Sequence, residues 1–157
     1  MKTLALISFF FLTAALHAQK LYEVPELKIS FYGPEDLDKY TEDNVLFVGF
    51  DNDYMAVEIE IFSWDEDADV YDQGPKKSAE YQTKLMGFID LKAGSELPFI
   101  PNSFYYEAVE DDDEEAPVFV FTAFAPDRTY VYEVQIYCYD GDVKRGKDIL
   151  NSFKLMD

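Results

Sequence analysis

Apolar and polar side chains alternate with a period of two along much of the chain, which is the pattern of half-buried β-strands. The first such run covers residues 27–31 and ends at Gly33-Pro34. Two longer runs at 45–50 and 54–64 are joined by Asp51-Asn52-Asp53, three residues that favour turns. The sequence therefore predicts an N-terminal strand followed by a β-hairpin.

Two segments replace this alternation with helical spacing. Pro75 begins the first helix, at the position where a missing N–H costs a helix least. Its predicted sheet-facing stripe is Ala79, Gln82, Leu85, Met86 and Ile89. Asp142 is the expected N-cap of the second helix. One side of that helix carries Val143, Gly146, Ile149, Leu150 and Phe153, and the missing side chain of Gly146 predicts a close approach to the sheet.

Three further strands, at 103–110, 118–125 and 129–139, lie between the two helices and form a meander with short links. Short links favour antiparallel pairing. No linker, repeat or change in composition divides the chain. The sequence thus predicts one α+β domain over residues 19–157. We expect a mainly antiparallel sheet made of the N-terminal strand, the hairpin and the three-strand meander, with one long central helix and one C-terminal helix.

This order of elements resembles the PsbP-like superfamily, which includes the extrinsic photosystem II protein, a eukaryotic Ran-binding protein and small bacterial envelope proteins of the DcrB type. The strand at 27–31, the hairpin at 45–64, the helix from Pro75, the meander at 103–139 and the closing segment 148–153 carry the resemblance. It implies the fold far more than the function, because the superfamily is functionally mixed and mostly non-catalytic. No functional motif of the family is present to assign site residues.

Residues 1–18 have the pattern of a secretory signal peptide. Lys2 precedes a short apolar run, and small residues lead to Ala18, after which we expect cleavage. The segment resembles a bacterial Sec signal, and the apolar run is short for a spanning helix, which needs about 20 residues. A retained membrane anchor is the alternative. We expect the mature protein to be exported, periplasmic or secreted, with no stable membrane anchor.

The chain of 157 residues is strongly acidic, with 13 Lys and Arg against 32 Asp and Glu and a formal net charge of −19. This charge argues against binding to nucleic acids, where basic side chains must neutralise phosphates. Apolar residues make up 48% and aromatic residues 17% of the sequence, which excludes a disordered acidic tail because such tails lack apolar surface to bury.

The sequence limits the available catalytic chemistry. The single histidine, His17, lies in the predicted leader, so the mature chain has no Ser-His or Cys-His pair. Cys138 is the single cysteine and cannot form an internal disulfide. It shares a strand face with Tyr132, Val134 and Ile136, which predicts a buried small hydrophobe rather than a reactive thiol.

Two sets of carboxylates are candidates for chemistry. Asp65, Asp67, Asp69 and Asp72 could contribute oxygens to a loose Ca²⁺ site, although a solvated acidic loop is the simpler interpretation. An EF-hand is excluded because its sixth and twelfth positions hold Val70 and Lys76. Glu58 and Glu60 are the strongest candidates for a hydrolytic carboxylate pair, but 32 acids make some pair inevitable. The run at 111–115 is interpreted as a solvated loop.

Aromatic residues on the outward strand faces are the main candidates for binding a partner. Phe62 and Trp64 share the outward face of one strand, and Tyr137 and Tyr139 that of another. The alternative is that a helix covers this face and the rings form a second layer of core. We therefore expect an exported, non-catalytic interaction or accessory protein of the bacterial cell envelope with an unknown partner. A Ca²⁺-responsive binding module is the alternative, and an envelope hydrolase is a third class.

Overall fold

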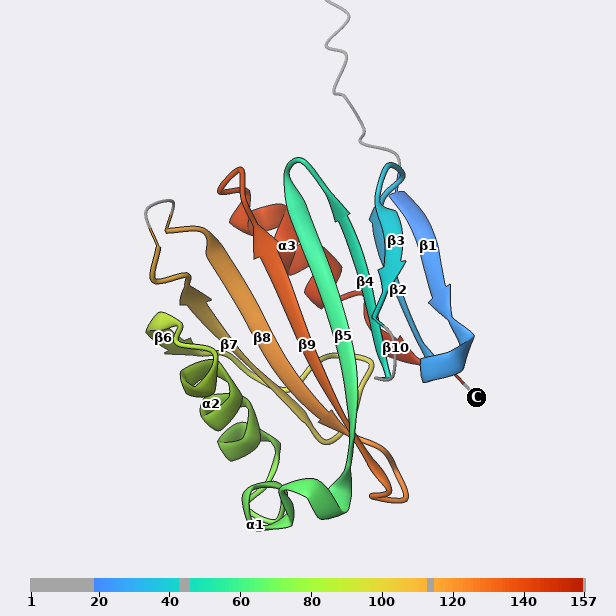
Figure 1. Ribbon diagram of the computed structural model, residues 1–157, viewed down its shortest axis with the longest axis vertical. Coiled ribbons are helices and arrows are strands. Elements are labelled where there is room, and N and C mark those ends of the chain that lie inside the picture. The colour runs from blue at the N-terminus through green and yellow to red at the C-terminus, as the bar shows by residue number, and fades with distance from the viewer. Residues whose placement is uncertain (1–18, 43–45, 113–114, 157) are drawn as a thin grey trace, which may run out of the picture.

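The computed structural model describes residues 19–42, 46–112 and 115–156. The predicted signal peptide, residues 1–18, lies outside the described residues, as do Asp113 and Glu114 of the acidic run. The described chain is an α+β fold built on two antiparallel sheets of seven and three strands (Figure 1). The predicted fold class is therefore confirmed, with the difference that the strands divide between two sheets.

The larger sheet contains the predicted hairpin and meander. Its strand order is β3 (Asp38–Thr41), β4 (Phe47–Asn52), β5 (Met55–Ser63), β9 (Tyr130–Cys138), β8 (Pro117–Phe124), β7 (Ser103–Val109) and β6 (Ile89–Ala93). Every neighbouring pair is antiparallel. The hairpin and meander strands were predicted to within about three residues, whereas the short strands β3 and β6 were not.

The smaller sheet holds the N-terminal strand that the pattern at 27–31 predicted. Its order is β1 (Gln19–Val24), β2 (Ile29–Pro34) and β10 (Lys154–Leu155), with the 3-10 turn η1 (Pro25–Leu27) between the first two strands. The placement of this strand in the main sheet was wrong. Its apolar residues instead pack across the core, where the Phe31 ring lies 5.3 Å from Phe50 and 4.9 Å from Phe153.

The helices lie on opposite faces of the seven-stranded sheet (Figure 1). On one face, η2 (Trp64–Glu66) and α1 (Ala68–Tyr71) lead into α2 (Pro75–Leu85), which packs on β7 and β8. On the other face, α3 (Val143–Leu150) and the three-stranded sheet enclose the main core. The segment predicted as an acidic loop, residues 65–74, therefore contains two short helical turns.

The buried side of α2 differs from the predicted stripe. Leu85 and Met86 are 63% and 45% exposed, and Ile89 belongs to β6. The helix ends at Leu85, and after Gly87, with φ of 81°, it is Phe88 rather than Leu85 or Met86 that packs on the sheet, against Tyr137. The helix instead buries the smaller or polar side chains Ser78, Ala79, Gln82 and Thr83.

The predictions of the Asp142 cap, the close approach at Gly146 and the buried cysteine are confirmed, whereas Val143 is 40% exposed and Phe153 lies beyond the end of the helix. The Asp142 carboxylate accepts a hydrogen bond from the Arg145 backbone N–H at 3.0 Å and so caps α3. A Cβ atom added to Gly146 would lie 2.5 Å from Cys138 Sγ and 2.7 Å from Phe119 Cε2. Cys138 is buried, and this burial raises the pKa of its thiol to about 12, which keeps it protonated and unreactive.

Within the described ranges, no helix combines the length and the apolar character needed to cross a lipid bilayer.

Gly146 gives a direct test of the contact between α3 and the sheet. Gly146→Ala should lower the free energy of unfolding by about 1–2 kcal/mol, because overpacking against Cys138 and Phe119 outweighs the better helix propensity of alanine. Urea denaturation measures the change. Lys144→Ala in the same helix is the control and should change stability by less than about 0.5 kcal/mol, since Lys144 is exposed. A Gly146→Ala variant as stable as wild type would contradict the close approach.

Candidate functional site

The face of the seven-stranded sheet on the α2 side is covered unevenly. α2 packs on β7 and β8, whereas β4 and β5 lie toward the opposite edge of the sheet, which α2 does not cover (Figure 1). Glu58, Glu60 and Phe62 of β5 are accordingly half-exposed on this face. Tyr40 of β3 and Phe47 of β4 are half-exposed next to them. We call these five side chains and Tyr139 the open face.

The register of β5 and β9 places the four predicted contact residues on the same side of the sheet, at two separate ends. Phe62 pairs with Val131, and Ala56 pairs with Tyr137. The two pairs are six residues apart, or about 20 Å at the rise of a strand. Phe62 and Trp64 therefore lie at the end next to α1, and Tyr137 and Tyr139 lie at the other end.

Tyr137 lies on the predicted face but is only 8% exposed, so the expectation that it contributes a surface ring is corrected. Phe88 covers it at a ring distance of 6.0 Å, and Tyr139 stacks on it at the same distance. Phe88 belongs to the turn after α2, which no strand pattern locates. Tyr139 remains 43% exposed and is the ring that the surface presents at this end.

Trp64 is half-buried and anchors α1 to the sheet. Its ring contacts Phe124 edge-on at 4.9 Å and Tyr71 at 5.7 Å, and the Arg128 guanidinium lies 5.5 Å from its centre. Cation–π contact and burial of this kind stabilise the local packing. Phe62, next to Trp64 on the sheet, is therefore a better candidate than Trp64 for a residue that contacts a partner without also anchoring α1.

Tyr40 is a member of the open face that the sequence pattern did not reveal. Its ring lies flat over Gly49, so that any side chain at position 49 would clash with it. Its hydroxyl donates a hydrogen bond to Glu58 Oε1 at 2.9 Å, and its ring lies 5.7 Å from Phe47. The glycine within a strand was the available signal, because such a residue often marks a close approach by a neighbouring group.

Carboxylates fill the middle of this sheet face. Glu60 pairs with Glu133 across the strands, and Glu58 pairs with Gln135. Partial burial, together with the charges of Glu42, Glu58 and Glu66, raises the pKa of Glu60. The two glutamates proposed as a hydrolytic pair thus lie on a half-exposed sheet surface, where the Tyr40 hydroxyl engages Glu58.

Glu133 is the most perturbed acid of this face and was not singled out from the sequence. It is 4% exposed, and burial, followed by the charges of Glu60 and Asp67, raises its pKa to about 8. Tyr71 of α1 lies close enough to Glu133 that each group influences the pKa of the other. Thr122, its partner on β8, is fully buried, and the Thr122 hydroxyl finds no hydrogen-bond partner among the described residues. This buried acid is mostly neutral at pH 7.

The acidic segment considered for calcium does not form a preformed cage. Asp65, Asp67, Asp69 and Asp72 are all exposed along η2 and α1. In the part of the chain that the structure describes, no three His, Cys, Asp or Glu side chains gather closely enough to hold a metal ion. The Ca²⁺ interpretation remains a prediction, and binding there would require these carboxylates to rearrange.

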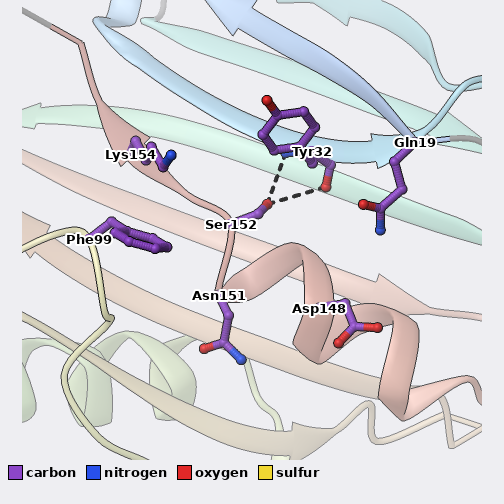
Figure 2. A pocket seen from close by; sticks show the side chains of 7 residues that line it. All are labelled: Gln19, Tyr32, Phe99, Asp148, Asn151, Ser152 and Lys154. Atoms are coloured by element: carbon purple, nitrogen blue, oxygen red, sulfur yellow. Dashed lines mark hydrogen bonds between the residues drawn. The ribbon is translucent and has the colours of Figure 1, made fainter.

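A shallow pocket of about 430 Å³ lies on the opposite side of the molecule, between α3 and the smaller sheet (Figure 2). The Ser152 hydroxyl points to β2, where it accepts a hydrogen bond from the Tyr32 N–H at 2.9 Å and donates to backbone carbonyls. Asp148 pairs with Lys144. The serine hydroxyl is therefore engaged with the backbone, and residues 19–156 contain no histidine.

Comparisons with known proteins identify the fold. The sequence matches no protein-family model and no curated protein. The solution structure of cyanobacterial PsbP (CyanoP) from Synechocystis sp. PCC 6803 is similar, with a TM-score of 0.60 and 12% identity over 91% of this chain and 95% of that chain. The Saccharomyces cerevisiae Ran-binding protein Mog1p has a TM-score of 0.57 and 9% identity over 90% and 97% of the two chains.

A protein from Bacteroides thetaiotaomicron also has a similar structure, with a TM-score of 0.52 and 11% identity. The similarity covers 88% of this chain and 48% of that one, so this chain spans about half of its length. At these identities the similarity concerns the fold alone. The predicted PsbP-like resemblance is thus confirmed as a fold, while the DcrB-type comparison remains a prediction.

Glu133 predicts an unusual pH dependence of stability. A carboxyl whose pKa rises from 4.5 to about 8 on folding adds stability that is complete below pH 4.5 and is lost as the pH rises through 8. The contribution is at most about 5 kcal/mol. Glu133→Gln keeps a neutral side chain of similar size at this buried position, so at pH 9 this variant should be more stable than wild type. Urea denaturation at pH 5, 7 and 9 measures the difference.

Glu23→Gln in β1 is the matched control, because Glu23 is exposed and its replacement removes the same formal charge. This control should keep the wild-type decline in stability between pH 5 and 9. If the stability of Glu133→Gln declined between pH 5 and 9 as steeply as that of the control, the inference that Glu133 is buried and neutral would be wrong.

Proposed function

We propose that this protein is an exported, non-catalytic interaction protein of the bacterial cell envelope and that the open face binds its partner. The observation that carries the proposal is the exposure of aromatic rings around carboxylates on a sheet face that α2 does not cover. Tyrosine and phenylalanine supply large, rigid contact area, and tyrosine adds a hydrogen-bonding group.

The proposed export rests on the leader pattern at residues 1–18. Removal of the leader takes away one lysine and no acid, which changes the formal net charge from −19 to −20. A chain without a disulfide must then be stabilised by its core, and the large cluster between the two sheets supplies that stability. The periplasm or the medium is the proposed location.

A non-catalytic role is supported by the state of the polar groups. Ser152 bonds to the backbone, Cys138 is buried with a raised pKa, and Glu58 is engaged by Tyr40. The PsbP and Ran-binding proteins of similar structure supply a precedent at the level of the fold. We therefore propose recognition rather than turnover.

The charge of the open face indicates the chemistry of the partner. Glu58, Glu60 and the nearby Glu42 and Asp51 place negative charge around the rings. A partner with lysine or arginine side chains complements this surface, and such charges accelerate association. We propose a protein partner with a basic surface and an apolar centre that packs on Phe62 and Tyr139.

The test begins with the immobilised mature protein and an envelope extract of the native host. The recovered partner is then titrated against purified variants. Phe62→Ala and Tyr139→Ala should each weaken binding by about fivefold or more, because truncated interface rings lose contact area. Tyr32→Ala, which removes a ring of similar exposure from the smaller sheet, is the control and should bind as wild type.

The charged part of the surface is tested separately. Glu58→Gln with Glu60→Gln should slow association and make binding less sensitive to salt, because rim charges act mainly on the association rate. A partner that binds both ring variants with unchanged affinity would contradict the open face as the interface.

A further inference from the structure

A second cavity lies on the other face of the sheet, at the end formed by the turn between β8 and β9. Its volume is about 420 Å³, within the range of small-molecule sites. Ala125, Pro126 and Tyr130 of the turn form one wall, and Leu155 and Met156 at the end of the described chain form the other. Leu155 also packs against the main core, so the cavity borders the apolar space between the two sheets.

Tyr132 gives this cavity a specific polar group. The residue is 6% exposed, and its side chain lies on the core face of β9, opposite Ile61 and Ala123. Its hydroxyl makes no hydrogen bond with any described residue, although the residue lines the cavity. Burial and the charge of Asp127, on the cavity wall, raise the pKa of this hydroxyl. It therefore remains a protonated donor at neutral pH.

Lys28 supplies a positive charge at the same cavity. Its backbone adopts φ of 51°. Its carbonyl accepts a hydrogen bond from the Met156 N–H at 2.8 Å, which fixes Lys28 next to the wall formed by Leu155 and Met156. Its ammonium forms no ion pair within 4.0 Å among the described residues. Asp127 accepts two hydrogen bonds from Thr129, at 3.1 and 2.7 Å, and these bonds, followed by a smaller effect of the Lys28 charge, lower its pKa.

The Tyr132 hydroxyl and the Lys28 ammonium are thus two donors, one neutral and one cationic, that line the cavity next to apolar walls without a hydrogen bond or an ion pair to another described residue. A complementary ligand supplies an acceptor with negative charge and an apolar body. We propose that this cavity binds a small monocarboxylate with an apolar chain, whose carboxylate contacts the Tyr132 hydroxyl and Lys28 while the chain lies along Leu155 and Met156. This site lies on the opposite face of the sheet from the open face and does not depend on the function proposed for it.

Octanoate is the probe, measured by isothermal titration calorimetry and by backbone amide shifts of the mature protein. Binding at millimolar concentration should shift the amides of Lys28, Ala125 and Met156. Octanol keeps the chain without the charge, and acetate keeps the charge without the chain, so both should bind at least about fivefold more weakly.

Tyr132→Phe keeps the buried ring and removes the hydroxyl, so it should fold as wild type and weaken octanoate binding by roughly three- to tenfold. Lys28→Asn removes the charge with a residue that tolerates positive φ, and should weaken binding similarly and reduce its salt dependence. Tyr54→Phe, an exposed tyrosine in the turn between β4 and β5, is the control and should bind as wild type.

Three results would overturn the proposal. The first is the absence of amide shifts at the cavity with saturating octanoate. The second is octanol binding as tightly as octanoate, which would show apolar partition without recognition of the carboxylate. The third is unchanged octanoate affinity in both Tyr132→Phe and Lys28→Asn, when each variant has the wild-type unfolding midpoint.

Discussion

The antiparallel pairing of β5 with β9 is the constraint on which both sides of this molecule depend. It joins nine residue pairs at the centre of the larger sheet. On one face it brings Val57 against Ile136 and Ile59 against Val134, all of them buried in the main core. On the other face it aligns Glu60 with Glu133. Because strand side chains alternate, a slip of one residue would move the glutamates into the core and the core residues into water.

The same pairing explains the electrostatic character of the sheet face. It places Glu133 where α1 removes it from water, and the cost of burying a charge there is avoided because the side chain holds a proton. Tyr71, whose ring packs against Trp64 and Phe124, joins the helical segment to the sheet beside this acid. The negative charge that a partner would meet is consequently concentrated at Glu58 and Glu60 of β5 rather than at Glu133 of β9.

The second face shows how small differences in side-chain size control the packing. Gly146 lets α3 lie directly on Cys138 and Phe119, so the helix closes one end of the core. At the other end, the turn between β8 and β9 and the last described residues stand apart and leave a cavity. CyanoP and Mog1p share the fold at 12% and 9% identity. At these identities the similarity concerns the fold alone and does not transfer a function.

Much of this architecture is encoded locally in the sequence. The alternation at 54–64 and 129–139, the turn between the first hairpin strands, the Asp142 cap and the burial of Cys138 could all be predicted, because each depends on a few neighbouring residues. The short strands β1, β3, β6 and β10 could not. They contain few residues, and their pairing partners lie elsewhere in the chain, so local periodicity carries little information about them.

The candidate sites also divide into features that neighbouring residues predict and features that depend on distant segments of the chain. The sequence placed Phe62, Trp64, Tyr137 and Tyr139 on one side of the sheet, because the period of a strand determines its faces. Only the tertiary structure showed that Phe88 buries Tyr137, that Tyr40 covers Gly49, and that the chain end leaves the Tyr132 hydroxyl at a cavity. Those outcomes depend on contacts between segments far apart in the chain, where the position of a helix end or a turn decides which side chains lose contact with water.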